Sequence, residues 1–207
     1  MTASQHGAPF GGHDVVLAGA RVTLRPHGPE TLPALRRWYG DPEVARLSRH
    51  RNQPLGADDV DRLVVARMHA AETLAFAIYA RVPPPPDDGE RDRPTEVLVG
   101  SCSLANLDTA NAAATFHLLI GEPDWRGRGL GREATALVAA FAFEQLGLER
   151  LALTAFSFNE AAIRCYRAVG YREEGRAREA IARDGRRWDE IHMGLLAREW
   201  RAARAGD

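Results

Sequence analysis

The stretch Ala113–Leu146, AATFHLLIGEPDWRGRGLGREATALVAAFAFEQL, decides the fold of this chain. It opens with an apolar run of strand length, Phe116 to Ile120, passes a turn-rich segment at 121–124, and enters a loop of glycines and arginines at 126–131. Apolar residues at helical spacing follow and predict an amphipathic helix. A strand, a glycine loop and a helix in this order direct several backbone N–H groups at one anion, helped by the positive end of the helix dipole. The sequence therefore predicts a phosphate-binding loop.

The spacing within the loop excludes two common phosphate-binding motifs. A P-loop requires a lysine after its second glycine, and a dinucleotide-binding loop requires G-x-G-x-x-G close behind its strand. Glycine lets a ligand approach the backbone closely, and arginine suits the geometry of phosphate. The loop taken alone could equally be a solvated turn. Its residues match R-x-x-G-x-G: Arg126, Gly127, Arg128, Gly129, Leu130 and Gly131.

The composition is that of an ordinary globular protein. The chain has 207 residues, enough for one domain, with 45% hydrophobic and 27% charged residues and a formal net charge of −1. This balance gives no reason to expect a nucleic acid or an anionic membrane as a partner. All 27 basic residues are arginine, so the chain has no side-chain lysine of its own to acylate.

The cysteines and the lengths of the apolar runs indicate the cellular compartment. Cys102 and Cys165 give neither a disulfide framework nor the spacing of a metal site, so we expect no metal and a reducing, cytoplasmic location. No apolar run reaches the length that spans a membrane, and residues 1–12 lack the apolar core of a signal peptide.

The order of predicted elements favours one domain with a mixed sheet. We expect a flexible tail at 1–14, a single domain at 15–200 and a C-terminal tail at 201–207. Pro83 to Thr95, with four consecutive prolines, is interpreted as an insert in a hairpin loop, the alternative being a domain boundary. Consecutive strands followed by two strand–helix units favour a mixed α/β sheet flanked by helices. Strands are predicted at 15–25, 73–82, 97–104, 116–120, 150–156, 171–181 and 188–196.

Helices are predicted between these strands. Asp41 and Pro42 read as the N-cap and first residue of one of them. A loop at 48–55 carries a small basic cluster, Arg49, His50 and Arg51. The other helices are predicted at 29–39, 57–71 and 159–168, and after the glycine loop.

A second motif, taken together with the glycine loop, indicates a protein family. Asn159 to Tyr171 reads N-x-x-A-x-x-x-Y-x-x-x-G-Y. Together with R-x-x-G-x-G, and in the same order and separation, this resembles the GNAT N-acetyltransferase superfamily. The resemblance covers most of residues 15–200 and is closest to the branch of the ribosomal-protein-alanine acetyltransferases (RimJ/RimL-like) and their small-amine relatives.

The resemblance implies a fold and a cosubstrate. The implied fold is a mixed, mostly antiparallel sheet of about seven strands, splayed between strands 4 and 5 and flanked by helices. The implied cosubstrate is acetyl-CoA, with its pyrophosphate on the 126–131 loop, Asn159 on the pantetheine arm and Tyr166 facing the sulfur. The implied cofactor-binding residues are Leu119, Ile120, Gly121, Arg126, Gly127, Arg128, Gly129, Leu130, Gly131, Asn159, Ala162 and Tyr166.

The splay also implies a chemistry. Strands that separate near 119–121 and 156–158 would leave backbone groups unpaired, and an N–H at Leu119 or Ile120 could polarise a thioester carbonyl. Tyr166 is the implied acid that protonates the departing thiolate, against the alternative of a core tyrosine.

The general base has several candidates, because many members of the resembled family carry a glutamate where this chain has Thr115. His117 lies two residues on, on the same strand face, and histidine titrates near neutrality. It could instead be a packed, hydrogen-bonded histidine. Little base is needed if the acceptor is an α-amine, whose deprotonation at pH 7 costs about 1 kcal/mol, against about 4–5 kcal/mol for a lysine-like amine. Spare candidates are Glu72, Glu122 and Asp108.

The expected function is acetyl transfer from acetyl-CoA to a primary amine, either a protein or peptide N-terminus or a small molecule. The alternative is a CoA-binding sensor or assembly module without turnover. A homodimer is a further expectation, with the 172–187 hairpin as one candidate surface.

Overall fold

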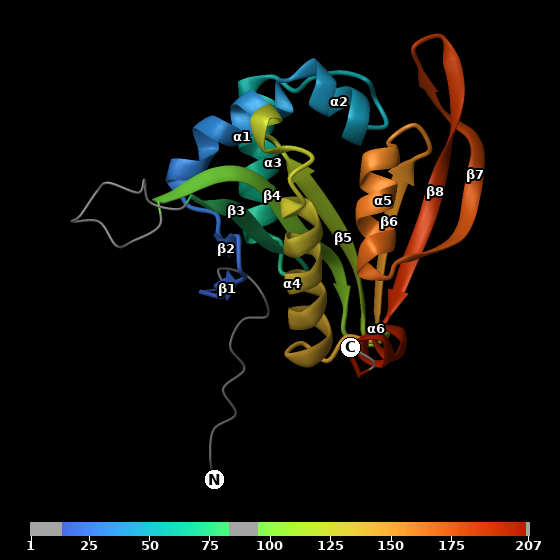
Figure 1. Ribbon diagram of the computed structural model, residues 1–207. Helices are drawn as coiled ribbons and strands as arrows, with labels where there is room; N and C mark the ends of the chain where they lie inside the picture. The colour runs from blue at the N-terminus through green and yellow to red at the C-terminus, as the bar shows by residue number, and fades with distance from the viewer. Residues whose placement is uncertain (1–13, 83–94, 206–207) are drawn as a thin grey trace.

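Eight strands form one sheet in the order β1-β2-β3-β4-β5-β6-β8-β7 (Figure 1). The computed structural model describes residues 14–82 and 95–205, so the predicted tail at 1–14 and the predicted insert at 83–95 lie outside the described residues except for their last residues. Every neighbouring pair is antiparallel except β5 with β6, which confirms the mixed sheet. The strands are β1 Leu17–Ala18, β2 Val22–Pro26, β3 Leu74–Val82, β4 Thr95–Asp108, β5 Ala113–Ile120, β6 Arg150–Phe156, β7 Arg172–Arg183 and β8 Arg186–Leu196.

Helices cover both faces of the sheet. One face carries α4 and α5, and the main core fills the space between them and the strands. On the other face, α1 and α3 form a smaller core around Leu35, Trp38 and Val60, against which Leu119 packs. The helices are η1 Pro29–Thr31, α1 Leu32–Tyr39, α2 Pro42–Ser48, α3 Ala57–His69, η2 Pro123–Trp125, α4 Leu130–Glu144, α5 Glu160–Val169 and α6 Ala197–Ala205.

Alternation along β5 explains how one strand serves both cores. Ala114 and Phe116 are buried in the main core, because successive side chains of a strand point to opposite faces. His117 and Leu119 therefore face the side of α1 and α3. The predicted N-cap of α2 is also confirmed, since the Asp41 carboxylate accepts a hydrogen bond from the Glu43 N–H at 2.8 Å.

The sheet opens between β5 and β6. The two strands are paired at only three positions, Ala113 with Arg150, Ala114 with Leu151 and Thr115 with Ala152, and then diverge (Figure 1). This is the predicted splay. The strands are the fifth and sixth rather than the fourth and fifth, because the first predicted strand is divided into β1 and β2.

The C-terminal end differs from the prediction. Residues 201–205, expected in a tail, continue helix α6, which the sequence analysis did not predict. Trp200 is buried there, and its ring lies 5.6 Å from that of Phe143 on α4. The rest of α6 is rich in arginine and alanine, so it shows little apolar periodicity of its own.

Candidate active site

The glycine loop ends directly at the first turn of α4. Gly127 and Gly129 have φ values of 72° and 79°, a left-handed conformation that side chains other than glycine rarely adopt. Gly129 is the N-cap of α4, and no side chain caps this end of the helix. The first-turn N–H groups therefore have no side-chain cap, and a helix end of this kind can bind an anion.

Arg21, the residue before β2, holds the loop through hydrogen bonds to its backbone carbonyls. Its guanidinium donates to the carbonyl oxygens of Arg128 at 2.9 Å and Gly129 at 3.4 Å, and to the Glu133 carboxylate at 3.0 Å. Because the C=O and N–H of a trans peptide point in opposite directions, fixing these carbonyls turns the following N–H groups away from Arg21. Sequence reasoning missed Arg21, which is more than a hundred residues away along the chain and lies in no motif.

The two arginines of the loop have different surroundings. Arg126 donates to the carbonyl oxygens of Ile120 at 3.0 Å and Gly121 at 3.1 Å, and its guanidinium lies 3.0 Å from the Glu43 carboxylate of α2. Arg128 is exposed, with its guanidinium 4.9 Å from the centre of the Trp125 ring. Arg126 thus connects the loop to the end of β5 and to α2, and Arg128 is the one that faces solvent.

The end of β5 presents a backbone group to the opening. The Gly121 N–H donates to the Val99 oxygen at 2.9 Å, so the facing residues Gly100 and Ile120 form a non-hydrogen-bonded pair. The backbone groups of Ile120 therefore point away from β4, and its carbonyl is the one that Arg126 binds. By the same alternation, the N–H of Leu119 points toward β4.

Gly121 has a packing role at this point. A Cβ atom there would lie 2.1 Å from a ring atom of Trp38 on α1, so only glycine fits. The Trp38 indole N–H also donates to the Glu122 carboxylate at 3.1 Å, and Arg37 pairs with the same carboxylate.

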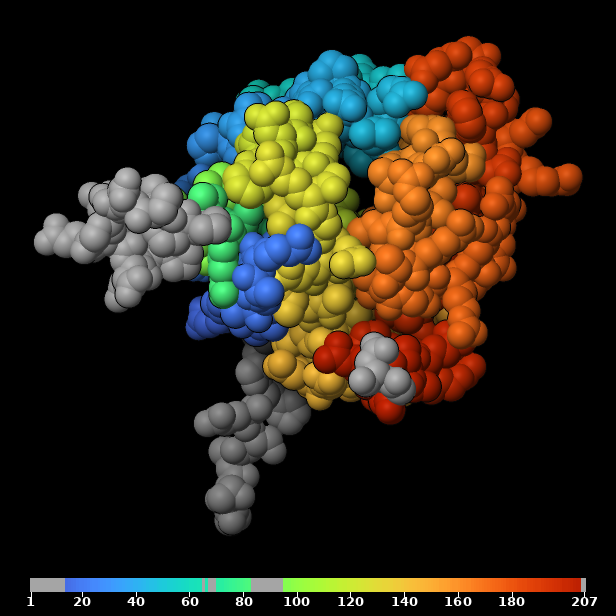
Figure 2. Space-filling view, in the orientation of Figure 1, coloured from blue at the N-terminus to red at the C-terminus, as the bar shows by residue number. Residues whose placement is uncertain are grey.

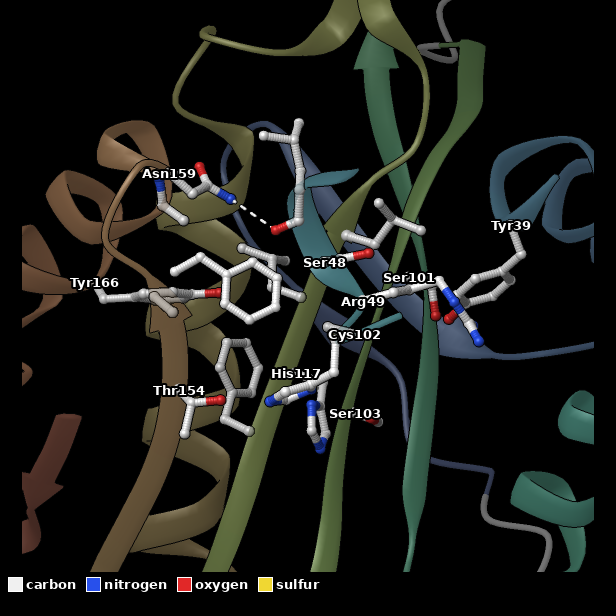
Figure 3. Close-up of a pocket in the computed structure, with 18 of the residues that line it drawn as sticks. Tyr39, Ser48, Arg49, Ser101, Cys102, Ser103, His117, Thr154, Asn159 and Tyr166 are labelled. Carbon is white, nitrogen blue, oxygen red and sulfur yellow. Dashed lines mark hydrogen bonds between the residues drawn. The ribbon is translucent and has the colours of Figure 1, made fainter. Parts of the chain in front are cut away.

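A cavity of about 480 Å³ occupies the opening between β5 and β6 (Figure 3). In Figure 2 the surface is hollowed between the yellow residues of the loop and α4 and the orange residues of α5. The lining comes from both faces of the sheet, so the cavity passes through it. The lining residues are Tyr39, Leu47, Ser48, Arg49, His50, Arg51, Ser101, Cys102, Ser103, Phe116, His117, Leu118, Leu119, Thr154, Ala155, Phe156, Asn159, Ala162 and Tyr166.

Tyr166 and Asn159 reach the cavity from α5. Tyr166 is only 6% exposed, and Figure 3 shows its hydroxyl directed into the cavity. Burial raises the pKa of the Tyr166 phenol, so this group stays protonated at neutral pH. The Asn159 side chain accepts from the Ala162 N–H at 3.2 Å, which caps α5, and donates to the Leu47 carbonyl of α2 at 3.3 Å.

Of the candidate bases, His117 is the one that lines the cavity. It is exposed and lies opposite Ser103 in the β4–β5 register. Thr115 shares its strand face but lies outside the lining, where it accepts a hydrogen bond from Asn106 at 3.4 Å. The spare carboxylates also lie outside the lining: Glu72, Glu122 and Asp108.

Several lining residues were not assigned a role from the sequence. Ser101, Ser103 and Thr154 belong to strands whose alternation gave no reason to single them out. The basic cluster at 49–51 was visible in the sequence, but only the fold brings it to the cavity.

Two further features can be stated for residues 14–82 and 95–205. No three histidine, cysteine, aspartate or glutamate side chains are grouped there so as to hold a metal ion. No helix in this part of the chain combines the length and apolar character needed to cross a bilayer.

Comparison with known proteins identifies the family. A model of the acetyltransferase (GNAT) domain matches residues 21–172, most of the chain. The chain belongs to the GNAT acetyltransferase family. The predicted family is therefore confirmed, and the two motifs at 126–131 and 159–171 lie within the matched segment.

Relatives within the family differ in their named acceptors. YdaF of Bacillus subtilis (strain 168), provisionally named a ribosomal N-acetyltransferase, is 35% identical over 103 residues, 50% of this chain and 56% of YdaF. Spermidine N(1)-acetyltransferase of Escherichia coli (strain K12) is 28% identical over 115 residues, 56% of this chain and 58% of that enzyme. The chain thus spans little more than half the length of these curated GNAT relatives. The ribosomal branch is not singled out.

Solved structures agree in fold. The spermidine N-acetyltransferase of Vibrio cholerae, solved in complex with CoA and spermine, superposes with a TM-score of 0.74 at 19% identity, covering 88% of this chain and 99% of that one. The predicted GNAT fold, a mostly antiparallel mixed sheet flanked by helices, is confirmed.

Proposed function

We propose that this GNAT chain is an acetyl-CoA-dependent N-acetyltransferase that acts on a primary amine. The observation that carries the proposal is the cavity in the opened sheet, whose lining includes side chains of α5 as well as side chains of α1 and α2. A donor and an acceptor can thus approach each other from opposite faces. The named acceptors of the relatives, ribosomal in one case and spermidine in another, leave the acceptor open.

The loop fits the pyrophosphate of the coenzyme. Left-handed glycines, an uncapped helix N-terminus and the exposed Arg128 supply N–H groups and positive charge at one place. Gly131 packs closely against β5, since a Cβ there would lie 3.1 Å from the Leu118 side chain. Arg21 and Arg126 hold the loop rather than contact the ligand.

The end of β5 fits the thioester. When bound, acetyl-CoA would supply an acetyl group whose thioester carbon is open to attack by an amine. The Ile120 N–H, directed into the opening, is the donor we assign to the carbonyl oxygen. Asn159 and Ala162 then border the pantetheine arm.

Tyr166 and His117 are assigned the two proton transfers. The Tyr166 phenol, kept protonated by burial, donates to the leaving sulfur. His117, with Ser103 beside it on β4 and Thr154 also lining the cavity, takes the proton of the acceptor amine directly or through water. The acid therefore belongs to α5, and the base belongs to β5 on the side of α1 and α3, where we place the acceptor.

The test is release of CoA thiol from acetyl-CoA in the presence of an amine panel of N-terminal peptides, amino acids and spermidine. We expect release that depends on both the protein and an amine, with a mass increase of one acetyl group on the amine. Tight binding of acetyl-CoA without turnover on any amine would instead support a CoA-binding module.

A further inference from the structure

The cavity is lined by arginine and histidine but, within the described chain, by no carboxylate. Arg49, His50 and Arg51 come from the loop after α2, and His117 comes from β5. Arginine is protonated at every pH at which proteins remain folded. The acceptor side of the cavity therefore carries positive charge.

Two carboxylates near this side of the cavity, those of Glu190 and Glu43, already form ion pairs. Glu190 pairs with His50 and lies 3.9 Å from His192. On α2, Glu43 pairs with Arg126 at 3.0 Å. A polycationic acceptor such as a polyamine would meet arginines in the cavity and no carboxylate on its lining.

Arg49 has hydrogen-bonding capacity that the protein does not use. Its Nε–H is buried and has no hydrogen-bond partner among the residues that the structure describes. Figure 3 shows the Arg49 guanidinium extending toward Tyr39 and Ser101. This nitrogen is closed to solvent, so an acceptor oxygen in the cavity would meet the rest of the guanidinium, which adds charge to a lining that has no carboxylate.

Arg183 holds the backbone around Arg49 in place before any ligand binds. Arg183, only 4% exposed, donates to the carbonyl oxygens of Arg49 and His50, the latter at 3.1 Å, and to that of Arg46 at 3.3 Å. Its guanidinium also lies 5.6 Å from the centre of the Phe156 ring. Binding at Arg49 thus requires little ordering of the backbone.

We propose that the acceptor carries a carboxylate close to its amine and that Arg49 binds this carboxylate. Arg51 adds to the positive electrostatic potential around it. The inference rests on the N-acetyltransferase function proposed above. Arginine and carboxylate match in geometry and form strong charge-assisted hydrogen bonds. The carboxylate can be that of a free amino acid or an acidic side chain near a peptide N-terminus.

The experiment compares pairs of acceptors with and without the carboxylate. One arm uses peptides with glutamate or glutamine at the second position. The other uses alanine and alaninamide, with each kcat/KM referred to the unprotonated amine, because amidation also lowers the pKa of that amine. Spermidine is the cationic reference. We expect kcat/KM to be about tenfold or more higher for the acid member of at least one pair, and the arm that responds identifies the source.

Variants assign the effect to Arg49. R49Q should bring the acid-to-amide ratio close to one, mainly through KM, while kcat/KM for the amide acceptor changes less than about threefold. R198Q, at an exposed arginine of α6, is the matched control and should keep the wild-type ratio. If R49Q does not fold, the wild-type ratio measured against salt replaces it, since an ionic preference must fall as salt rises.

Each outcome decides something. A ratio near one in both pairs, a preference for spermidine, or a ratio that survives R49Q or high salt would overturn this inference while leaving the acetyltransferase intact. Absence of CoA release with every acceptor would overturn the proposed function itself.

Discussion

Tyr166 and Tyr171 are two buried tyrosines with their ring centres 5.9 Å apart, yet their hydroxyls have different surroundings. The Tyr166 hydroxyl reaches the cavity, whereas the Tyr171 hydroxyl is buried without a hydrogen-bond partner in the described part of the chain. Burial raises the pKa of both phenols. Removing the same oxygen atom at each position should therefore have different consequences.

Tyr166→Phe should lower kcat by about 100-fold or more, since a positioned general acid contributes that much. The KM for acetyl-CoA should stay nearly unchanged, because the ring still packs against Phe116. Steady-state kinetics at saturating acceptor measure both values. Equal turnover of the variant and the wild type would remove the acid role.

Tyr171→Phe is the matched control and a prediction of its own. It should leave kcat unchanged and raise the free energy of unfolding by about 1 kcal/mol, because it removes an unpaired buried hydroxyl. Urea unfolding measures the change. A loss of stability would show that the hydroxyl has a partner in solution.

At the scale of elements, Glu133 connects β2 to α4. Its carboxylate accepts from the backbone N–H groups of Arg21 at 2.7 Å and Val22 at 3.3 Å. Burial raises the pKa of this carboxyl, but hydrogen bonds from Arg21 and Val22 outweigh burial and leave the pKa below its usual value. A lowered folded pKa stabilises the fold above the unfolded value of about 4.3, and this stabilisation is lost as the pH falls through the folded pKa.

Arg21→Ala should raise the KM for acetyl-CoA about tenfold, because the charge-assisted hydrogen bonds to the Arg128 and Gly129 carbonyls of the loop are lost. At saturation, kcat should change little, since Arg21 does not line the cavity. A short acetyl thioester without the diphosphate provides the control. Equal impairment with both donors would contradict a role confined to the loop.

The unpredicted helix α6 allows a prediction about stability. Trp200→Ala should cost about 3–5 kcal/mol of unfolding free energy, since the side chain is buried against Phe143. Thermal or urea unfolding tests this, with R198Q on the exposed side of α6 as the control. A change below about 1 kcal/mol would mean that α6 is not docked in solution.

The sequence predicted a glycine loop followed at once by a helix, and the structure has this order. Gly127 and Gly129, the N-cap of α4, belong to one continuous segment, so their conformation follows from residue type. Arg21 and Arg49 could not be assigned, because their roles depend on contacts with segments far away in the chain. Helix α6 was missed because only two of its residues, Ala197 and Trp200, are buried, which is too few to form a recognisable apolar pattern in the sequence.

For the whole molecule, passage of the cavity through the sheet favours direct transfer between two bound substrates. Cys102 also lines the cavity, but burial raises the pKa of its thiol, so it is not a thiolate at neutral pH. Double-reciprocal plots for the two substrates should therefore intersect. Cys102→Ala should keep kcat within about threefold. Parallel plots, together with loss of activity in this variant, would instead indicate an acetyl-cysteine.

The short ladder between β5 and β6 makes the chain two half-sheets joined at one end. A coenzyme bound in the gap would contact both half-sheets. It would raise the free energy of unfolding by about 2.7 kcal/mol when its concentration is 100 times its Kd. Starvation for the coenzyme would then leave the protein exposed to proteases. Its abundance in a cell would follow the supply of its own cosubstrate, with no separate regulator needed.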